Sequence, residues 1–513
     1  MTEDTVDATL RRQAALRGHE PAVIDPDDRA TFFELDKSTR SLAAGLLQAG
    51  VNRGTRVGLL MPNGVDWIRL AFAVTRIGAV LVPLSTLLAP RELLAQLRRA
   101  SVQYLISIDE FRGHRYRQTV DAQLAELPAL QQVWTARQAL SLPRTPVTDN
   151  VVDGVGAGVR PSTELVIMFT SGSRGAPKGV VHSHGNALAA VRSGLAARCV
   201  TAQSRLYLPM PLFWVGGFGA GALTALVSGA ALVTEAIPTP ESTLRLLARE
   251  RVTLFRGWPS QAEALAQHLE SVDADLSALR PGSLEALFPE HLRSAKGARA
   301  NLFGMTESFG PFCGFAADTD MPRSAWGSCG KPFPGMQVRI VDPDTGVAVA
   351  PGEVGEIQIR GPHVLRGILG RTRQEVFTAD QFYPTGDLGH FDADGFLFYH
   401  GRSDDMFKVS GATVYPAEVE DALRSIDGVR AVAVTDVPGP DGPQVAALIA
   451  GNGTVSSLRT AARKLLSSFK VPTVWKLIDD DTEIPRGATG KIDVTALRAR
   501  LTSPGDSDDP ALP

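Results

Sequence analysis

The stretch FTSGSRGAPKGVVHSH occupies residues 169–184 and follows an apolar run that begins at Leu165. It places hydroxyl residues, glycines and a lysine within ten positions, so that backbone N–H groups and hydroxyls can surround phosphate oxygens. It lacks the Gly-Lys-Ser/Thr ending of a Walker A loop, because Pro177 precedes Lys178 and Gly179 follows it. A surface turn would account for the glycines and the proline but not for the hydroxyl run. The stretch therefore predicts a phosphate-binding loop after a strand of an α/β fold.

Three further segments contain residue types suited to nucleotide chemistry. They are NLFGMTES at 301–308, the run from Tyr383 to Glu420 that contains TGD and GRSDDMFKVSG, and EIPRGATGKID at 483–493. Together with the loop, these segments resemble the signatures of the adenylate-forming superfamily in order and spacing. That superfamily includes acyl-CoA synthetases, firefly luciferase and the adenylation domains of peptide synthetases. The resemblance spans roughly residues 20–500.

The resemblance implies how ATP is bound. Phe303, next to Gly304, is expected to stack on adenine. Thr306 is expected to contact the α-phosphate and Glu307 to help hold Mg²⁺, and both are expected to be catalytic. Arg174 stands where relatives usually have threonine; its guanidinium can contact phosphate strongly but needs more room. The loop residues expected to contact ATP are Thr170, Ser171, Gly172, Ser173, Arg174, Gly175 and Lys178.

By the same resemblance, the later segments complete the nucleotide site and supply a catalytic lysine, Lys491. Asp387 and Arg402 are expected to contact the ribose, Asp404 to be a hinge, and Gly411 to lie in the loop that approaches the pantetheine of CoA. When a carboxylate attacks the α-phosphorus of ATP, negative charge gathers on the α-phosphoryl oxygens and the leaving pyrophosphate. An ammonium group aimed between them stabilises that charge, and losing one such donor costs about 100- to 1000-fold in rate.

The segment PMPLFWVGGFGAG at 209–221 resembles the start of the family's acid pocket. Amino-acid-activating relatives have an aspartate directly after the phenylalanine, where it pairs with the substrate ammonium, and this chain has Trp214 there. Because a buried, unpaired ammonium is costly, we expect an acid without an α-amino group. Residues 280–293 depart from the family's Gly-Gly-Ala-Pro turn, and residues 361–385 lack the insertion typical of acyl-AMP ligases, which favours CoA as acceptor. The candidate pocket residues are Phe213, Trp214, Gly216 and Gly217.

Strand, helix and strand patterns alternate along the first 325 residues, as at 56–60, 65–77 and 78–83. This alternation indicates doubly wound α/β layers. Short alternating runs after residue 325, separated by Asp, Pro and Gly, predict an antiparallel sheet or a small barrel.

Beyond residue 401, predicted helices at 416–425 and 457–467 and strands at 431–436 and 445–450 indicate a compact α+β unit. The predicted fold is thus α/β. It consists of an N-terminal ATP- and acid-binding domain at 1–402, with doubly wound layers and a small β-barrel-like subdomain, a small mobile α+β domain at 403–501 that carries the catalytic lysine, and a disordered tail at 502–513.

Composition excludes several classes of protein. The 513 residues carry a net charge of −3 with no basic run, which argues against a nucleic-acid partner. Three widely spaced cysteines offer no disulfide framework and no CxxC zinc site, which favours a reducing cytoplasm. The acidic N-terminus lacks a signal peptide's apolar core. His182 and His184 lie two positions apart without a third ligand nearby, so we expect no metal at this pair.

One uncharged stretch, residues 206–234, is long enough to span a membrane. Pro209, Pro211 and five glycines interrupt it, which predicts a strand, a buried helix and a second strand rather than a transmembrane segment.

The sequence therefore predicts a cytoplasmic, ATP-dependent carboxylic acid–CoA ligase that forms acyl-AMP and then acyl-CoA, releasing pyrophosphate and AMP. ATP, Mg²⁺ and CoA are its expected cofactors, and its expected substrate is a small-molecule fatty or other apolar carboxylic acid, as in fatty acid metabolism. Three alternatives remain open: a stand-alone adenylating enzyme that loads a carrier protein, a luciferase-like oxygenase, and a sensor that has lost catalysis. Glu307 and Lys491 together argue against the sensor. A homodimer is an open alternative for the oligomeric state.

Overall fold

The computed structural model describes residues 4–170, 177–403, 407–409, 412–439, 442–466, 468–487 and 490–503. The chain forms two compact units: the first contains residues 1–338, 359–383 and 395–397, and the second contains residues 339–358, 384–394 and 398–513. The boundary between residues 402 and 403 stays a prediction. Of the predicted tail, residues 504–513 lie outside the described residues.

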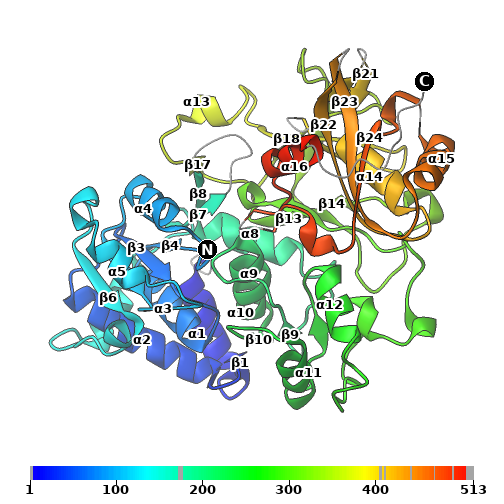
Figure 1. Cartoon of the computed structure of the whole chain (residues 1–513). Coiled ribbons are helices and arrows are strands. Elements are labelled where there is room, and N and C mark those ends of the chain that lie inside the picture. The colour runs from blue at the N-terminus through cyan, green and yellow to red at the C-terminus, as the bar shows by residue number, and fades with distance from the viewer. Residues whose placement is uncertain are drawn as a thin grey trace. The chain divides into compact units, whose positions relative to one another are not determined.

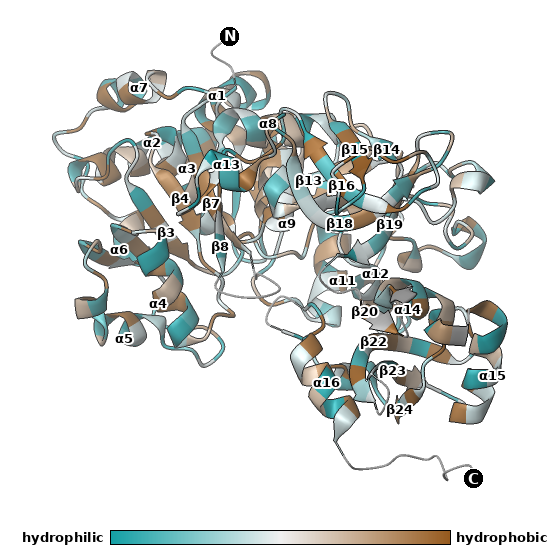
Figure 2. Ribbon diagram, turned by 90° about the horizontal axis from the view of Figure 1, so that it is seen from above, coloured by the Kyte–Doolittle hydropathy of each residue, from teal (hydrophilic) through white to brown (hydrophobic). Residues whose placement is uncertain are grey.

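The largest sheet of the first unit has seven strands in the order β17-β8-β7-β4-β3-β5-β6. The strands β3 to β7 run parallel, whereas β8 is antiparallel to β7 and β17 is antiparallel to β8. Their inner members are continuous apolar runs, as expected for parallel strands buried on both faces, and Figure 2 shows the brown of hydrophobic residues on β4. The bounds are β3 Arg56–Leu60, β4 Val80–Pro83, β5 Tyr104–Ser107, β6 Gln132–Thr135, β7 Glu164–Thr170, β8 Lys178–Ser183 and β17 Gly367–Ile368.

Helices cover both faces of this sheet. Leu81 of β4 packs in one hydrophobic cluster with Trp67 and Phe72 of α3 (Val65–Arg76). Its neighbour Val80 packs in another cluster with helix α4 (Pro90–Arg99). Successive residues of one strand thus face opposite layers, which confirms the predicted doubly wound arrangement. Further helices of the unit are α1 Val6–Arg17, α2 Phe32–Gln48, α5 Tyr116–Asp121, α6 Ala136–Leu140, α7 Asp149–Ala157 and α13 Arg373–Val376.

A second sheet has five strands in the order β11-β9-β10-β1-β2, and only β2 is antiparallel to its neighbour. The uncharged stretch at 206–234 supplies β9, a buried run of helix and β10, as predicted. Figure 1 shows its helices α9 and α10 next to α8 in green. No helix in the described part of the chain is long and apolar enough to cross a membrane. The bounds are β1 Pro21–Ile24, β2 Arg29–Thr31, β9 Arg205–Tyr207, β10 Ala231–Val233, β11 Leu254–Phe255, α8 His184–Ser193, α9 Val215–Gly217, a π-helical turn Phe218–Leu223, α10 Thr224–Ser228, α11 Pro240–Arg249 and α12 Pro259–Ala266.

Short strands follow, and the sequence predicts those after residue 325. One sheet has the order β12-β13-β14. Another, where the sequence predicts an antiparallel sheet or a small barrel, is a four-stranded sheet in the order β15-β16-β18-β19. The departing segment 280–293 contains two 3-10 turns and no strand. The bounds are β12 Phe303–Met305, β13 Gly310–Gly314, β14 Lys331–Pro332, β15 Gln337–Val341, β16 Gly355–Arg360, β18 Tyr383–Phe391 and β19 Leu397–Arg402.

The C-terminal part of the second unit is a three-stranded sheet, β22-β23-β24, with helices on both faces, visible in orange and red in Figure 1. Val432 and Val434 of β22 face the cluster that contains α14 and α15, whereas Ala433 faces the cluster that contains α16. The predicted α+β unit is confirmed, and β24 and α16 are additional to the prediction. The bounds are β20 Phe407–Val409, β21 Ala412–Val414, α14 Pro416–Arg424, β22 Val429–Gly439, β23 Gly442–Gly451, α15 Val455–Leu465, β24 Val474–Ile478 and α16 Val494–Thr502.

Candidate active site

The predicted phosphate loop connects two paired strands. Thr170, the last residue of β7, pairs with Lys178, the first residue of β8. Both ends of the loop are therefore fixed by an antiparallel ladder, and both side chains are half-buried. The loop residues between them, including Ser171, Gly172, Ser173, Arg174 and Gly175, lie outside the described residues.

A tight turn presents the predicted Thr306 and Glu307. Strand β12 leads into a 3-10 turn, Thr306–Ser308, which ends at Phe309 in the left-handed conformation with φ of 53°. The chain then returns as β13, and a Cβ atom on Gly304 would collide with the carbonyl of Gly310. Only glycine fits this approach of the two strands.

Two contacts from other segments hold Glu307. Its carboxylate Oε1 lies 3.2 Å from the hydroxyl of the buried Tyr383, which donates to it. Its backbone carbonyl accepts a hydrogen bond of 2.8 Å from the N–H of Leu365. Glu307 is thus held both at its backbone and at its half-buried carboxylate. Tyr383 and Leu365 were not among the predicted site residues.

A buried histidine contacts the same turn. The His182 side chain is 0% exposed, and its Nε2 lies 2.8 Å from the carbonyl oxygen of Thr306. Burial lowers the pKa of His182 to about 3. His184 is equally buried, but its Nδ1 accepts a hydrogen bond from the backbone N–H of Val6. The two imidazoles therefore bind different segments of the chain. No group of three or more metal-ligating side chains occurs among the described residues.

The segment that is predicted to begin the acid pocket packs beside the turn at 306–308. The rings of Phe213 and Trp214 meet edge to face at 5.6 Å, with Phe213 buried and Trp214 half-buried. A Cβ on Gly217 would collide with the carbonyl of Pro211, and one on Gly216 would press on a methionine side chain. On the next helical turn, Phe218 lies 6.3 Å from Phe309, ring centroid to ring centroid.

Phe303, which is predicted to stack on adenine, is half-buried, and its ring meets the ring of Phe312 edge to face at a centroid distance of 5.3 Å. The first unit thus brings the turn at 306–308 together with His182 of strand β8 and, through Phe309 and Phe218, with the aromatic segment at 213–218. The turn and the aromatic segment are two of the groups of residues that the sequence predicts for one site.

In the second unit, the predicted ribose residues lie together. The Nη1 of Arg402 is 3.4 Å from Oδ1 of the buried Asp387 and donates to the carbonyl of Thr385 at 2.7 Å. Lys491 is exposed, and its backbone carbonyl accepts from the N–H of Gly487 at 2.8 Å, which closes the loop that carries it. Asp404 and Gly411 lie outside the described residues.

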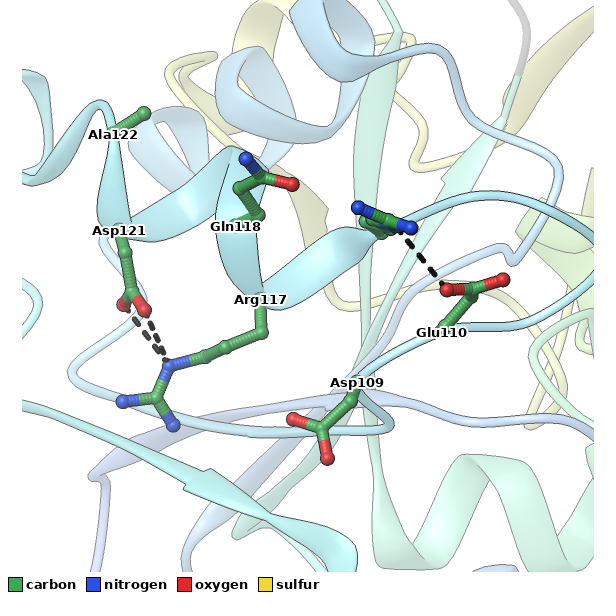
Figure 3. A pocket seen from close by; sticks show the side chains of 7 residues that line it. Asp109, Glu110, Arg117, Gln118, Asp121 and Ala122 are labelled. Atoms are coloured by element: carbon green, nitrogen blue, oxygen red, sulfur yellow. Dashed lines mark hydrogen bonds and ion pairs between the residues drawn. The ribbon is translucent and has the colours of Figure 1, made fainter.

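A surface hollow of about 500 Å³ in the first unit contains none of the predicted site residues. Figure 3 shows Arg117 pointing toward Asp121, and its Nε lies 2.8 and 3.0 Å from the two carboxylate oxygens. Arg115 pairs with Glu110 in the same hollow. Its cationic groups are therefore already paired with carboxylates of the protein.

Comparison with known proteins identifies the family. The family described as AMP-binding enzyme matches residues 10–369. The 3-[(3aS,4S,7aS)-7a-methyl-1,5-dioxo-octahydro-1H-inden-4-yl]propanoyl:CoA ligase of Mycobacterium tuberculosis (strain ATCC 25618 / H37Rv) is 32% identical over 517 residues, which cover 96% of this chain and 98% of that protein. Feruloyl-CoA synthase of an Amycolatopsis species is 30% identical over 508 residues, with 96% and 98% covered.

The fold matches that of ATP-bound MatB from Rhodopseudomonas palustris with a TM-score of 0.81 at 23% identity, and the match covers 98% of this chain and 99% of MatB. The four motifs quoted from the sequence, the mixed α/β fold and the full-length relatives agree. The chain belongs to the AMP-binding enzyme family, and it is an AMP-forming acyl-CoA synthetase.

Proposed function

We propose that the enzyme activates an apolar carboxylic acid without an α-amino group at the surface formed by the 213–218 segment and the 306–308 turn. The observation that carries this proposal is the packing of Phe218 on Phe309, the residue that directly follows the turn. It links the aromatic segment to Thr306 and Glu307. The acid's carboxylate, held beside an apolar wall, would then lie near the groups assigned to the α-phosphate.

The identity of the segment supports an apolar acid. Trp214 stands where an ammonium-binding carboxylate would be needed for an amino acid. Relatives are named as ligases of a fused-ring propanoate, of ferulate and of indoleacetate, all of which carry rings. We infer that the acid is a fatty, aryl or alicyclic acid. The test is a panel of these acids, with an α-amino acid as control, assayed for AMP release with and without CoA. An α-amino acid as the best substrate would contradict the proposal.

In the first half-reaction, a carboxylate oxygen attacks the α-phosphorus of ATP, the bond from that phosphorus to the bridging oxygen breaks, and pyrophosphate leaves with the bonding electrons. Thr306 donates to an α-phosphoryl oxygen. Lys491 places its ammonium between that oxygen and the leaving pyrophosphate, which offsets charge that develops only in the transition state.

The residues present fit Mg²⁺. In nucleotide sites this ion is held by one or two carboxylates together with substrate phosphates. Glu307 offers one half-buried carboxylate, oriented by the Tyr383 hydroxyl at 3.2 Å. When bound, the ion would neutralise charge on the phosphates. Arginine at position 174 and the ends of the loop, Thr170 and Lys178, are assigned to the same phosphates, and Asp387 and Arg402 to the ribose.

In the second half-reaction, the sulfur of CoA attacks the acyl carbon, the bond from that carbon to the phosphate oxygen breaks, and AMP leaves. The thiol proton passes to solvent. We assign residues 403–501 to a domain that turns about Asp404, withdraws Lys491 and brings Gly411 toward the pantetheine, so that one site performs both reactions.

Two substitutions test this assignment. Lys491→Ala should abolish pyrophosphate exchange but leave thioester formation from synthetic acyl-AMP, whereas Asp404→Pro should do the reverse. Equal loss of both reactions in Asp404→Pro would count against a hinge. Comparing CoA with a holo-carrier protein as acceptor separates the CoA ligase from the carrier-loading alternative.

We place the enzyme in the cytoplasm, where ATP and CoA are available and where its three free thiols stay reduced. The choice between a monomer and a homodimer is open to sedimentation velocity measurements at two protein concentrations.

A further inference from the structure

The amide of Asn186 fixes the state of the buried His182 imidazole. The Oδ1 atom of Asn186 accepts from the backbone N–H of Ser183 at 2.7 Å, and an N–H can only donate, which identifies this atom as the oxygen. The amide nitrogen therefore donates to Nδ1 of His182 at 2.7 Å and to the carbonyl of His363 at 3.1 Å. Nδ1 of His182 is thus an acceptor, and the proton of the neutral ring lies on Nε2.

That proton points at the turn at 306–308. Nε2 of His182 donates to the carbonyl of Thr306 at 2.8 Å, across 124 residues of sequence. Both ring nitrogens are therefore satisfied within the protein. The ring of Phe309 closes one side, edge to face at a centroid distance of 4.9 Å. A shift of the turn would leave a donor and an acceptor buried without partners, which costs about 1–3 kcal/mol per group.

The other side of the turn is tied to the same network. The segment that follows His363 supplies the N–H of Leu365, which binds the carbonyl of Glu307. Asn186 thus anchors both the imidazole that holds Thr306 and the segment that holds Glu307. These contacts join strand β8, helix α8 and the turn within the first unit.

We propose that His182 is a positioning residue for acyl-adenylate formation: oriented by Asn186, its neutral imidazole holds the Thr306 carbonyl and so aligns the Thr306 hydroxyl and the Glu307 carboxylate with ATP. This inference rests on the roles proposed above for Thr306 and Glu307. The two half-reactions depend on this alignment to different extents, because pyrophosphate leaves only in the first. Thioester formation from acyl-AMP involves neither the β- and γ-phosphates nor the ion that accompanies them.

The test compares variants at position 182 in both half-reactions. In His182→Leu the donor is lost, and we expect the kcat of pyrophosphate exchange to fall about 10- to 100-fold, the range for a small misplacement of a catalytic group. The rate of thioester formation from synthetic acyl-AMP should fall less than about 3-fold. His182→Gln, whose amide nitrogen can take the place of Nε2, should restore most of the exchange rate. His182→Asn, whose amide is too short to reach Thr306, should not.

The matched control is His184→Leu. His184 is as buried as His182, but its Nδ1 binds Val6 rather than the turn. Its loss should lower thermal stability and leave the ratio of the two half-reactions unchanged. Should His182→Leu not fold, the pair His182→Gln and His182→Asn carries the same comparison.

Two results would overturn the inference: an unchanged exchange rate in folded His182→Leu and His182→Asn, or an equal loss of both half-reactions, which would indicate a purely structural role. Glu307→Gln separates this failure from that of the proposed function. If Glu307→Gln exchanges pyrophosphate normally, the assigned role of Glu307 is wrong. If it loses on the order of 100-fold while the His182 variants are normal, only the positioning role is wrong.

Discussion

Three buried histidines in the first unit should make its stability fall steeply as the pH is lowered from 7 to 5. His182 and His184 are 0% exposed and His363 is 1% exposed. Burial lowers the pKa of His182 and His184 to about 3 and that of His363 to about 4, from an ordinary value of 6.5. The folded unit therefore keeps these side chains neutral at pH 5, whereas an unfolded chain protonates them.

The sign and size of the effect follow from proton linkage. Below pH 6.5 the unfolded state binds more protons, so the free energy of unfolding decreases as the pH falls, by up to about 1.4 kcal/mol per pH unit and histidine, until each folded-state pKa is reached. Between pH 7 and pH 5 each histidine contributes a loss of about 2 kcal/mol, and the three together about 6 kcal/mol. Unfolding at pH 5 should take up about three protons at these side chains.

Urea unfolding followed by tryptophan fluorescence measures this loss. Five of the six tryptophans lie in the first unit, so the signal reports chiefly on that unit. In His184→Gln the loss between pH 7 and pH 5 should shrink by about 2 kcal/mol, because glutamine does not titrate. Plots of the free energy of unfolding against pH should run parallel for the variant and the parent between pH 8 and pH 7. A stability that is flat between pH 7 and pH 5, or an undiminished loss in the variant, would refute the reasoning.

Three substitutions and one pH effect extend the test. Arg76→Met should cost about 3–5 kcal/mol in urea unfolding, because the buried guanidinium lies between the carboxylates of Asp7 and Asp36 and its loss leaves these carboxylates only their more exposed partners Arg11 and Arg40; a cost below about 1 kcal/mol would contradict this role. Gly304→Ala should lower stability by about 1–3 kcal/mol and impair pyrophosphate exchange, since the added Cβ pushes apart the strands that flank the turn; wild-type exchange would contradict the close approach. Burial raises the pKa of Glu420 to about 7, so the second unit should gain stability as the pH falls from 7 toward 4.5. Glu420→Gln should remove that gain, as measured by amide hydrogen exchange in β22.

Local patterns predicted the elements of the fold well. Continuous apolar runs such as Val80–Pro83 gave parallel strands, and the uncharged stretch at 206–234 gave a strand, a helical run and a strand rather than a membrane helix, because proline and glycine interrupt it. Apolar runs and hydrophobic periodicity indicate which residues are buried, and these strands and helices consist largely of buried residues. The hairpin of β7 and β8 was not predicted, since its first strand is apolar but its second carries Lys178 and His182.

The partners of the site residues could not be predicted in the same way. Tyr383 reaches Glu307 across 76 residues and His182 reaches Thr306 across 124. Such pairs are set by how sheets and loops pack, and no local spacing encodes them. The motif signatures predict roles for Thr306 and Glu307, whereas the residues that orient them can be any donor at the right place. From the sequence alone, His182 stands out only as half of a two-histidine pair at which we expect no metal.

Adenylate chemistry makes one atom traceable, and following that atom tests the assigned function most directly. In the proposed reaction, a carboxylate oxygen of the acid forms a bond to the α-phosphorus and stays there when the thiol displaces AMP. With an acid labelled with ¹⁸O in both carboxylate oxygens, each turnover should deliver one ¹⁸O to AMP and none to pyrophosphate, as read by mass spectrometry. Label in pyrophosphate or in inorganic phosphate, or AMP without label while acyl-CoA accumulates, would contradict an acyl-adenylate intermediate.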